Sequence, residues 1–279
     1  MKLSILTATY NRAKYLERIY KSIHQNQLSS NIEAEWIIID DGSTDDTKEV
    51  VENFVSENKV IIKYIFQKNS GKMAAINRGM KEVTGELIVD CDSDDFFAED
   101  AFRVIEKNAF NLLKNEKLYA LCFLKQDFLG NISGKKFDIN YMESTMFDLY
   151  FKQDIEGEKI LVFNTKIRKK FKHELEENEK FITEARMYHK MDENYNILCI
   201  NEVIEIGDYI FDGYTMNIFQ TFKKSPNGYY KYFKEIFKKN LNEVSVRKKI
   251  YILKNYSLFL ILRDKNNIFK KKITSNPKK

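Results

Sequence analysis

The stretch that decides the fold of this chain is Val89 to Phe97, VDCDSDDFF. An apolar run ends at Val89, and a dense group of aspartates follows: Asp90, Asp92, Asp94 and Asp95. Carboxylates this close repel one another, so a folded chain tolerates them where water, a cation or a helix N-terminus offsets their charge. Asp92 and Asp94 have the spacing of a Mg²⁺ or Mn²⁺ site, whose ion is held by one or two carboxylates and by substrate phosphates. The alternative is a solvated acidic turn that caps a helix starting at Glu99.

The segments around this stretch alternate between strands and helices. Short apolar runs predict buried parallel strands at Lys2–Thr9, Glu35–Asp40, Val60–Phe66 and Glu86–Asp90. Amphipathic segments predict a helix after each strand, including Ala13–Asn26, a helix capped by Ser43, and Glu99–Glu116. The alternation is that of a doubly wound α/β sheet, in which ligands bind at the C-terminal ends of the strands. We therefore expect three polar clusters to converge on one crevice: Thr9-Tyr10-Asn11, Asp40-Asp41-Gly42 and Asp92-Ser93-Asp94.

Composition indicates one large domain, or one domain plus an accessory segment, with a well-developed core. The chain has 279 residues, 43% of them hydrophobic, with only 2 prolines and 10 glycines. Its 3 cysteines are widely spaced and odd in number, which argues against a disulfide framework and a zinc site. The apolar stretch at the N-terminus is too short for a signal peptide, and no apolar run reaches about 18 residues. We therefore expect a cytoplasmic protein.

The net charge of +5 is unevenly distributed along the chain. Residues 221–279 carry 17 Lys and Arg against 3 Asp and Glu, a charge of +14 that leaves −9 for the remainder. Basic and aromatic residues alternate there with helical periodicity from Tyr229 onward. This segment can bind nucleic acid, form ordinary solvated helices, or lie on an anionic membrane. No motif supports nucleic acid, and lysine-rich amphipathic helices suit an anionic bilayer surface.

The crevice itself excludes two common nucleotide-binding classes. No Gly-x-Gly-x-x-Gly follows the first strand and no P-loop Gly-Lys-Ser/Thr is present, which argues against dinucleotide dehydrogenases and P-loop phosphotransferases. A crevice rimmed by carboxylates repels a diphosphate unless a divalent cation bridges the two. The simplest compatible ligand is a nucleoside-diphosphate compound together with its metal.

Four motifs in this order and spacing resemble family 2 glycosyltransferases: SILTATYNR, EWIIIDDGSTDDT, NSGKMAAINRGMKEVTGE and VDCDSDD. The resemblance covers residues 1–116 and continues more weakly through residues 179–215. It implies a GT-A type Rossmann-like mixed sheet flanked by helices, and an inverting transferase that uses a UDP-sugar and Mn²⁺ or Mg²⁺. We expect residues 1–116 to bind the nucleotide-sugar, 117–217 to form the acceptor-binding and catalytic half of the same domain, and 218–279 to form a basic helical extension.

The resemblance also implies roles for individual residues. Asp41 matches the position that accepts a hydrogen bond from the uracil N3, and the alternative for Asp41 is to cap the next helix. Asp94 should ligate the metal, and Asp92 should contact the ribose or the metal's water shell. Asp95 has no such match, and we expect it to cap the following helix. The full set of expected nucleotide-binding residues is Ala8, Thr9, Tyr10, Asp41, Lys72, Asn77 and Asp92. For Tyr10 the alternative is core packing.

The reaction requires a general base for the acceptor hydroxyl, and we expect it in the second half of the chain. Glu184, in EKFITEARMYHKM, best matches the family's carboxylate, with Glu179 and Asp212 as alternatives. A surface carboxylate is the structural alternative for Glu184. His189 is expected on a helix face rather than in the metal shell, and His173 on the surface.

We therefore expect a hexosyltransferase-type enzyme of cell-surface polysaccharide synthesis. It moves a sugar from a UDP-sugar to a glycan or a lipid-linked saccharide, in the cytoplasm or at the inner face of the plasma membrane. The alternative is a non-catalytic protein of the same fold in a glycan-assembly complex. The sequence does not identify the donor sugar, the acceptor or the linkage.

Overall fold

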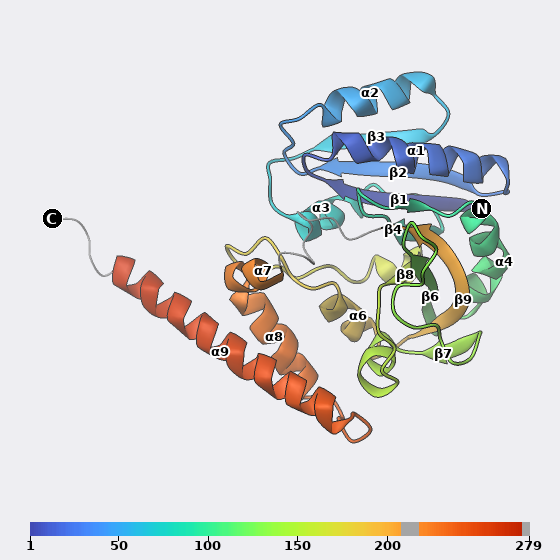
Figure 1. Ribbon diagram of the computed structural model, residues 1–279. Helices are drawn as coiled ribbons and strands as arrows, with labels where there is room; N and C mark the ends of the chain where they lie inside the picture. Colours follow the sequence, from blue (N-terminus) through green and yellow to red (C-terminus); the bar gives the residue numbers. More distant parts are fainter. Residues whose placement is uncertain (208–217, 275–279) are drawn as a thin grey trace. The chain divides into compact units, whose positions relative to one another are not determined.

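The computed structural model describes residues 1–207 and 218–274, and Figure 1 shows their arrangement. The described strands form one sheet in the order β3-β2-β1-β4-β8-β6-β9-β5, with β7 paired to β9. They are β1 Lys2–Thr9, β2 Glu33–Asp40, β3 Ile61–Phe66, β4 Leu87–Asp90, β5 Phe96–Phe97, β6 Leu118–Gln126, β7 Met142–Ser144, β8 Lys159–Asn164 and β9 Asn196–Ile206. The first helices are α1 Ala13–Leu28, α2 Thr47–Glu57, α3 Lys72–Gly79 and α4 Ala101–Lys114.

The first four long strands are parallel, as their apolar sequences predict. β1 pairs with β2 on one side and with β4 on the other, and β3 pairs with the outer side of β2. The chain therefore runs outward from β1 to β3 and then returns to the opposite side of β1. This places the switch in strand order between β1 and β4, where parallel sheets bind their ligands.

Alternate residues of these strands supply two hydrophobic cores, one on each face of the sheet. Leu3 and Ile5 of β1 pack in a core with residues of α1, α2 and α4, such as Leu16. Leu6, on the opposite face, packs in a core with Ile76 of α3. In Figure 1, α1 and α2 accordingly cover one face and α3 the other. The predicted α/β sheet flanked by helices is confirmed.

Beyond β4 the sheet becomes mixed. β8 is antiparallel to both β4 and β6, whereas β6 and β9 are parallel. The intervening elements are a short π-helix at Asp148–Lys152, α5 at Thr165–Arg168 and α6 at Ala185–Met191. The mixed extension of the sheet was expected, but the short strands β5 and β7 carry too few residues for a periodic signal.

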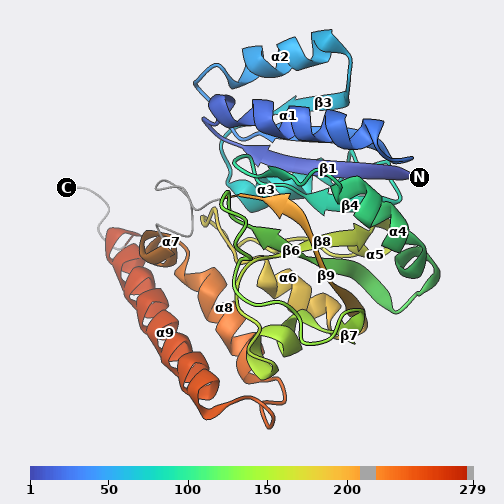
Figure 2. The ribbon, with the colours of Figure 1, turned by 45° about the vertical axis from the view of Figure 1, so that its right-hand side comes forward.

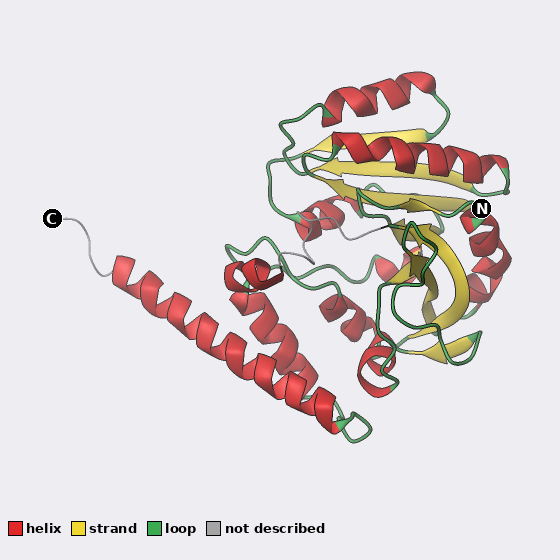
Figure 3. Cartoon of the chain, viewed as in Figure 1, coloured by secondary structure: helices red, strands yellow, loops and turns green. Residues whose placement is uncertain are grey.

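The described residues divide into two compact units, residues 1–173 with 187–207 and residues 174–186 with 218–274. The second unit is mainly helical, with α7 Ile218–Lys224, α8 Pro226–Phe237 and α9 Val246–Thr274 (Figure 3). α8 and α9 lie side by side in Figure 2, and Phe259 of α9 stacks on Tyr229 and Phe233 of α8. The expected division at 116/117 and 217/218 stays a prediction.

Two local expectations are wrong. α2 begins at Thr47 after Asp46, so Ser43 does not cap it; the Ser43 hydroxyl instead accepts a hydrogen bond from the Asn11 amide at 2.9 Å. His173, expected on the surface, is 4% exposed and lies 3.4 Å from the buried Arg168 guanidinium.

None of the helices in the described ranges is both long and apolar enough to cross a bilayer.

Candidate functional site

The three polar clusters meet at the C-terminal edge of the parallel strands. The Asp41 amide donates to the Thr9 carbonyl at 2.8 Å, and the Cys91 amide donates to the Leu6 carbonyl at 2.9 Å. The Asn11 side chain accepts from the Thr44 amide at 2.8 Å, which ties the loop after β1 to the loop after β2. The predicted convergence is confirmed.

The residues at the end of β1 differ in exposure. Tyr10 is 48% exposed, so its ring is not part of the core. Ala8 is half-buried, and Thr9 is 2% exposed. In residues 1–207 and 218–274 the Thr9 hydroxyl makes no hydrogen bond. The nucleotide-binding roles expected for these residues stay predictions.

The Asp41 carboxylate organises the loop that leads into α3. One oxygen accepts from the Gln67 side-chain amide at 2.7 Å and from the Ser70 amide at 2.8 Å. The other oxygen accepts from the Gly71 amide at 2.7 Å. Asp41 is 3% exposed and does not cap α2, which removes the structural alternative considered for it. A carboxylate oxygen accepts more than one hydrogen bond, so a base N–H remains a possible further donor.

Lys72 opens α3 and pairs with the acidic loop. Its ammonium lies 2.6 Å from one oxygen of Asp92 and 2.8 Å from the other. Gly71, directly before it, has a φ of +96°, a conformation that side chains other than glycine rarely adopt. The sequence thus positions a cation next to the first aspartate of the predicted metal pair.

Asp92, Asp94 and Asp95 form an acidic cluster whose ligand oxygens lie within 4.8 Å of one another. Asp92 and Asp94 are half-buried, and Asp95 is buried. Burial, and next the nearby Asp92, raise the pKa of Asp94 above its usual value. Oxygen ligands from carboxylates are what Mg²⁺ and Mn²⁺ prefer, so this donor set can hold either ion.

Asp95 does not cap a helix, contrary to expectation. α4 begins six residues later at Ala101, and its N-cap position is Asp100. The Asp95 carboxylate instead lies 2.6 Å from the Lys125 ammonium of β6. Burial raises the pKa of Asp95 to about 7, although the Lys125 charge opposes that shift. The strand LYALCFLKQ carries Lys125 inside an apolar run, a signal that sequence analysis did not use.

Arg18 of α1 is a second residue that the sequence did not identify. Its guanidinium donates to the Asp94 carbonyl at 3.0 Å and lies over the rings of Phe96 and Phe128, at 5.6 and 5.2 Å. It therefore connects α1 to the acidic loop. No local pattern distinguishes Arg18 from the other charged residues of an amphipathic helix.

The Asn77 side chain is used for a structural contact. It donates to the His173 carbonyl at 2.8 Å and accepts from the His173 amide at 3.0 Å. It thereby fixes a segment nearly a hundred residues later in the chain. The expected part of Asn77 in nucleotide binding stays a prediction, and the neighbouring Arg78 is exposed.

Two candidate bases, Glu184 and Glu179, belong to the second compact unit. Glu184 is half-buried and directly precedes α6. Glu179 is 8% exposed, and its carboxylate accepts from the Asn227 and Gly228 amides at 2.8 Å, at the start of α8. Glu179 thus has a structural task that the sequence did not show, and Asp212 lies outside the described residues.

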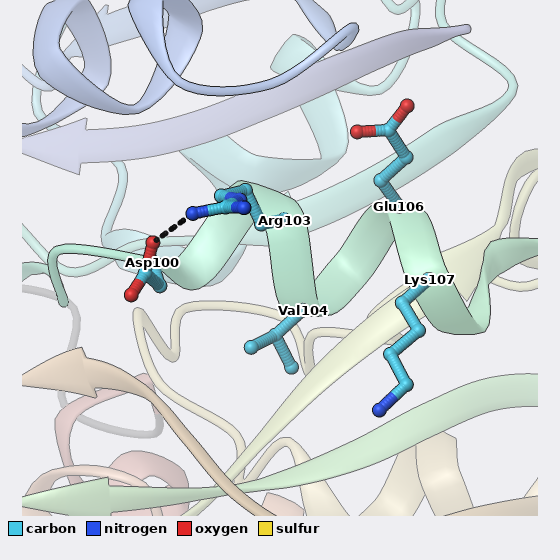
Figure 4. Close-up of a pocket in the computed structure, with 5 residues that line it drawn as sticks. All are labelled: Asp100, Arg103, Val104, Glu106 and Lys107. Atoms are coloured by element: carbon cyan, nitrogen blue, oxygen red, sulfur yellow. Dashed lines mark hydrogen bonds and ion pairs between the residues drawn. The ribbon is translucent and has the colours of Figure 1, made fainter.

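His189, expected on a helix face rather than in the metal shell, lies on α6, is 6% exposed and packs edge-on against Phe147 and Phe151. It is not part of the acidic cluster. A surface depression of about 460 Å³ lies along α4. Figure 4 shows five residues that line it, among them Asp100 and Arg103, which pair at 3.4 Å. Its lining contains none of the residues expected to bind nucleotide or metal.

Comparison with known proteins agrees with the resemblance seen in the sequence. Residues 4–124 match the model of glycosyl transferase family 2. The chain is 34% identical over 137 residues to the GalNAc(5)-diNAcBac-PP-undecaprenol beta-1,3-glucosyltransferase of Campylobacter jejuni, a match that covers 47% of this chain and 41% of that protein. The chain spans less than two thirds of the first curated relatives that it matches.

Two solved structures share the fold. TarS of S. aureus in complex with UDP has a TM-score of 0.62 at 20% identity, covering 93% of this chain and 71% of that one. The mannosyltransferase PcManGT of Pyrobaculum calidifontis, in complex with GDP-Man and Mn²⁺, has a TM-score of 0.58 at 16% identity, covering 85% and 64%. These likenesses establish the GT-A type of fold.

Proposed function

We propose that this chain transfers a hexose from a UDP-sugar to a saccharide acceptor, because residues 4–124 match the model of glycosyl transferase family 2. The observation that carries the proposal is the acidic cluster Asp92-Asp94-Asp95 at the same sheet edge as Asp41 and Tyr10. TarS, which shares the fold, binds UDP, and PcManGT binds Mn²⁺ with its nucleotide-sugar. Asp92 and Asp94 are the residues that hold the divalent ion.

Each residue of this edge has a task in the proposed reaction. Asp41 accepts from the uracil N3–H, a donor that cytosine lacks, and so selects uridine. Lys72 brings a positive charge beside Asp92, where the diphosphate is bound. The divalent ion, when bound, supplies Lewis-acid stabilisation of the charge on the leaving diphosphate.

We propose Glu184 as the general base of an inverting displacement. It removes the proton of the acceptor hydroxyl while that oxygen bonds to the anomeric carbon and the bond to the diphosphate breaks. Attack from the side opposite the leaving group inverts the anomeric configuration. Glu179 is the alternative candidate, and both of its oxygens accept hydrogen bonds at the start of α8.

The acceptor proposed is a lipid-linked saccharide. The Campylobacter relative is named for an undecaprenol-linked glycan, and a dolichyl-phosphate beta-glucosyltransferase of Trichomonas vaginalis is 37% identical over 118 residues. Such acceptors are presented at a membrane surface. We accordingly place the reaction in the cytoplasm, at the inner face of the plasma membrane, in the synthesis of a cell-surface polysaccharide.

α9 offers a surface for that membrane. Ile252 and Phe259 are fully buried, whereas Val246, Ile250, Leu253 and Ile261 are each between 48% and 72% exposed. The exposed four follow helical spacing and therefore share one face of α9. Arg247 and Lys254, both exposed, lie on the same helix. An apolar face with cations beside it fits an anionic bilayer.

Asp94→Asn provides the main test of function. With UDP-glucose, UDP-galactose or their N-acetyl forms, Mn²⁺ should raise the thermal stability of the wild type and support UDP release. Asp94→Asn should reduce turnover by about 10²-fold or more because the leaving group loses its cation. Mn²⁺-independent binding of UDP, or equal turnover in the variant, contradicts the proposal.

Glu184→Gln and Glu179→Gln form a matched pair for the base. Glu184→Gln should lower kcat by about 10²–10⁴-fold with little change in the KM for the UDP-sugar. Glu179→Gln should retain kcat and lower only stability. The reverse result assigns the base to Glu179.

Vesicle sedimentation tests the membrane surface. The wild type should bind vesicles that contain phosphatidylglycerol at low salt and ignore purely zwitterionic ones. Ile250→Ser with Leu253→Ser should lose binding. Ile61→Ser, which alters a 50% exposed apolar side chain on β3, is the control that should not. Equal binding by all three proteins contradicts the proposed face.

A further inference from the structure

Lys125 is a buried cation directly behind the acidic cluster. Only 8% of its side chain is exposed, and its ammonium lies 2.6 Å from Asp95. The Glu158 carboxylate lies 3.1 Å away and the buried Glu205 carboxylate 3.8 Å away. A lysine enters such a site only when carboxylates compensate its lost hydration. The ion pair between Lys125 and Asp95 therefore lies in the protein interior and is not a surface ion pair.

The Asp95 carboxylate is held from a second side by Gly207. A Cβ atom built on Gly207 would lie 1.6 Å from one oxygen of Asp95, so the carboxylate occupies the space that a side chain would take. The Gly207 amide donates to the Gln126 carbonyl at 3.0 Å, which fixes this backbone to β6. Asp95 is thus confined between Lys125 and the end of β9.

The confinement matters because Asp95 is close enough to join Asp92 and Asp94 around one ion. Two carboxylates, a divalent cation and the Lys72 ammonium beside Asp92 sum to a charge of about +1, which attracts a diphosphate. A third carboxylate cancels that charge and weakens the attraction. A site that binds a nucleoside diphosphate therefore binds it more tightly when the third aspartate is paired with a cation other than the metal.

We propose that Lys125 withholds Asp95 from the cation, so that only Asp92 and Asp94 ligate it and the bound ion stays attractive to the diphosphate. Lys125 is a positioning residue, because it acts on the ion only through Asp95. The inference rests on the proposed function, because it presupposes a divalent ion and a UDP moiety at this edge.

Lys125→Met is the test, with binding measured by calorimetry rather than by turnover. Mn²⁺ should bind the variant without nucleotide on the order of tenfold more tightly, because Asp95 becomes available as a ligand. UDP at saturating Mn²⁺ should bind on the order of tenfold more weakly. Lys125→Met with Asp95→Asn should restore both affinities, since the released carboxylate is then absent. Lys125→Arg should resemble the wild type.

Lys159→Met is the matched control. Lys159 is also buried, at 8% exposure, but its ammonium contacts the Ser133 and Glu156 carbonyls at 3.2 and 3.0 Å. Its loss should leave both affinities unchanged. Should Lys125→Met not fold, the same titrations apply to Lys125→Met with Glu205→Gln, which removes one buried carboxylate.

The outcomes separate this inference from the proposed function. Suppose that the wild type binds Mn²⁺ and UDP. If Lys125→Met then lowers both affinities, or changes neither of them, Lys125 has only a structural role and the inference is overturned. If the wild type binds neither, the proposed function fails and the inference fails with it. Opposite changes in the two affinities support the inference, because a general loss of structure cannot tighten Mn²⁺ binding.

Discussion

Lys125 and Arg186 are both buried cations surrounded by three carboxylates, but their partners differ in exposure. The partners of Lys125 are Asp95 and Glu205, with side chains 4% and 2% exposed, and the half-exposed Glu158. The partners of Arg186 are Glu174, Glu176 and Glu235, whose side chains are 46%, 15% and 41% exposed.

This difference in exposure determines how much the ion pairs of each cluster contribute to the stability of the folded protein. Water screens the charges around Arg186, so its ion pairs resemble those of a protein surface. The pairs of Lys125 lie in a low-dielectric interior, where removing one partner leaves uncompensated charge. Burial lowers the pKa of Lys125, but Glu205, Asp95 and Glu158 outweigh it and hold that pKa above its usual value. Lys125 therefore stays charged.

The largest effect is expected for Lys125→Met. It should lower the free energy of unfolding by about 3–5 kcal/mol, because buried carboxylates lose their only close cation in the cluster. Urea denaturation at pH 7 measures the loss. The defect should shrink at pH 5, where the carboxylates take up protons. A loss below about 1 kcal/mol at pH 7 would show that water reaches this cluster as it reaches the other.

Arg186→Met should have a smaller effect, confined to the second unit. Arg186 donates to both oxygens of Glu235, at 2.7 and 3.0 Å, and to the Glu174 carbonyl at 3.1 Å. We expect a loss of about 1–2 kcal/mol, since the exposed partners regain water. Hydrogen exchange in α8 should accelerate, while Mn²⁺ affinity should stay that of the wild type. A change in Mn²⁺ affinity would contradict the separation of the two clusters.

The contrast between the clusters also shows what the sequence could predict. β1 to β4 were predicted within two residues because short apolar runs end in polar residues that cannot continue a buried strand. The acidic cluster was predicted because its aspartates are adjacent in sequence. Both signals are local.

The contacts that the sequence missed all join distant segments. Asp95 pairs with a residue 30 positions away, and Glu179 binds the start of α8, 48 positions away. Ser43, which has the composition of a helix cap, binds the Asn11 amide instead. Lys125 within an apolar strand was a visible anomaly, but only the fold identifies its three partners.

The smallest effect is expected for Glu205→Gln. Burial, and next the Asp95 charge, raise the pKa of Glu205 well above its usual value. The pKa of Glu205 is therefore higher in the folded protein than in the unfolded chain, so this group makes the wild type less stable as the pH rises above its usual value of 4.5. Glutamine has the shape of the protonated acid and no proton to lose.

Glu205→Gln should accordingly be within about 1 kcal/mol of the wild type at pH 5, and the difference should move in favour of the variant between pH 5 and pH 8. Urea denaturation of both proteins across that range provides the comparison. If Glu205 is instead ionised and paired with Lys125, the variant loses stability as the pH rises. That opposite slope would make the interior cluster three salt bridges rather than two salt bridges beside a neutral acid, and the two clusters would then differ only in their exposure to water.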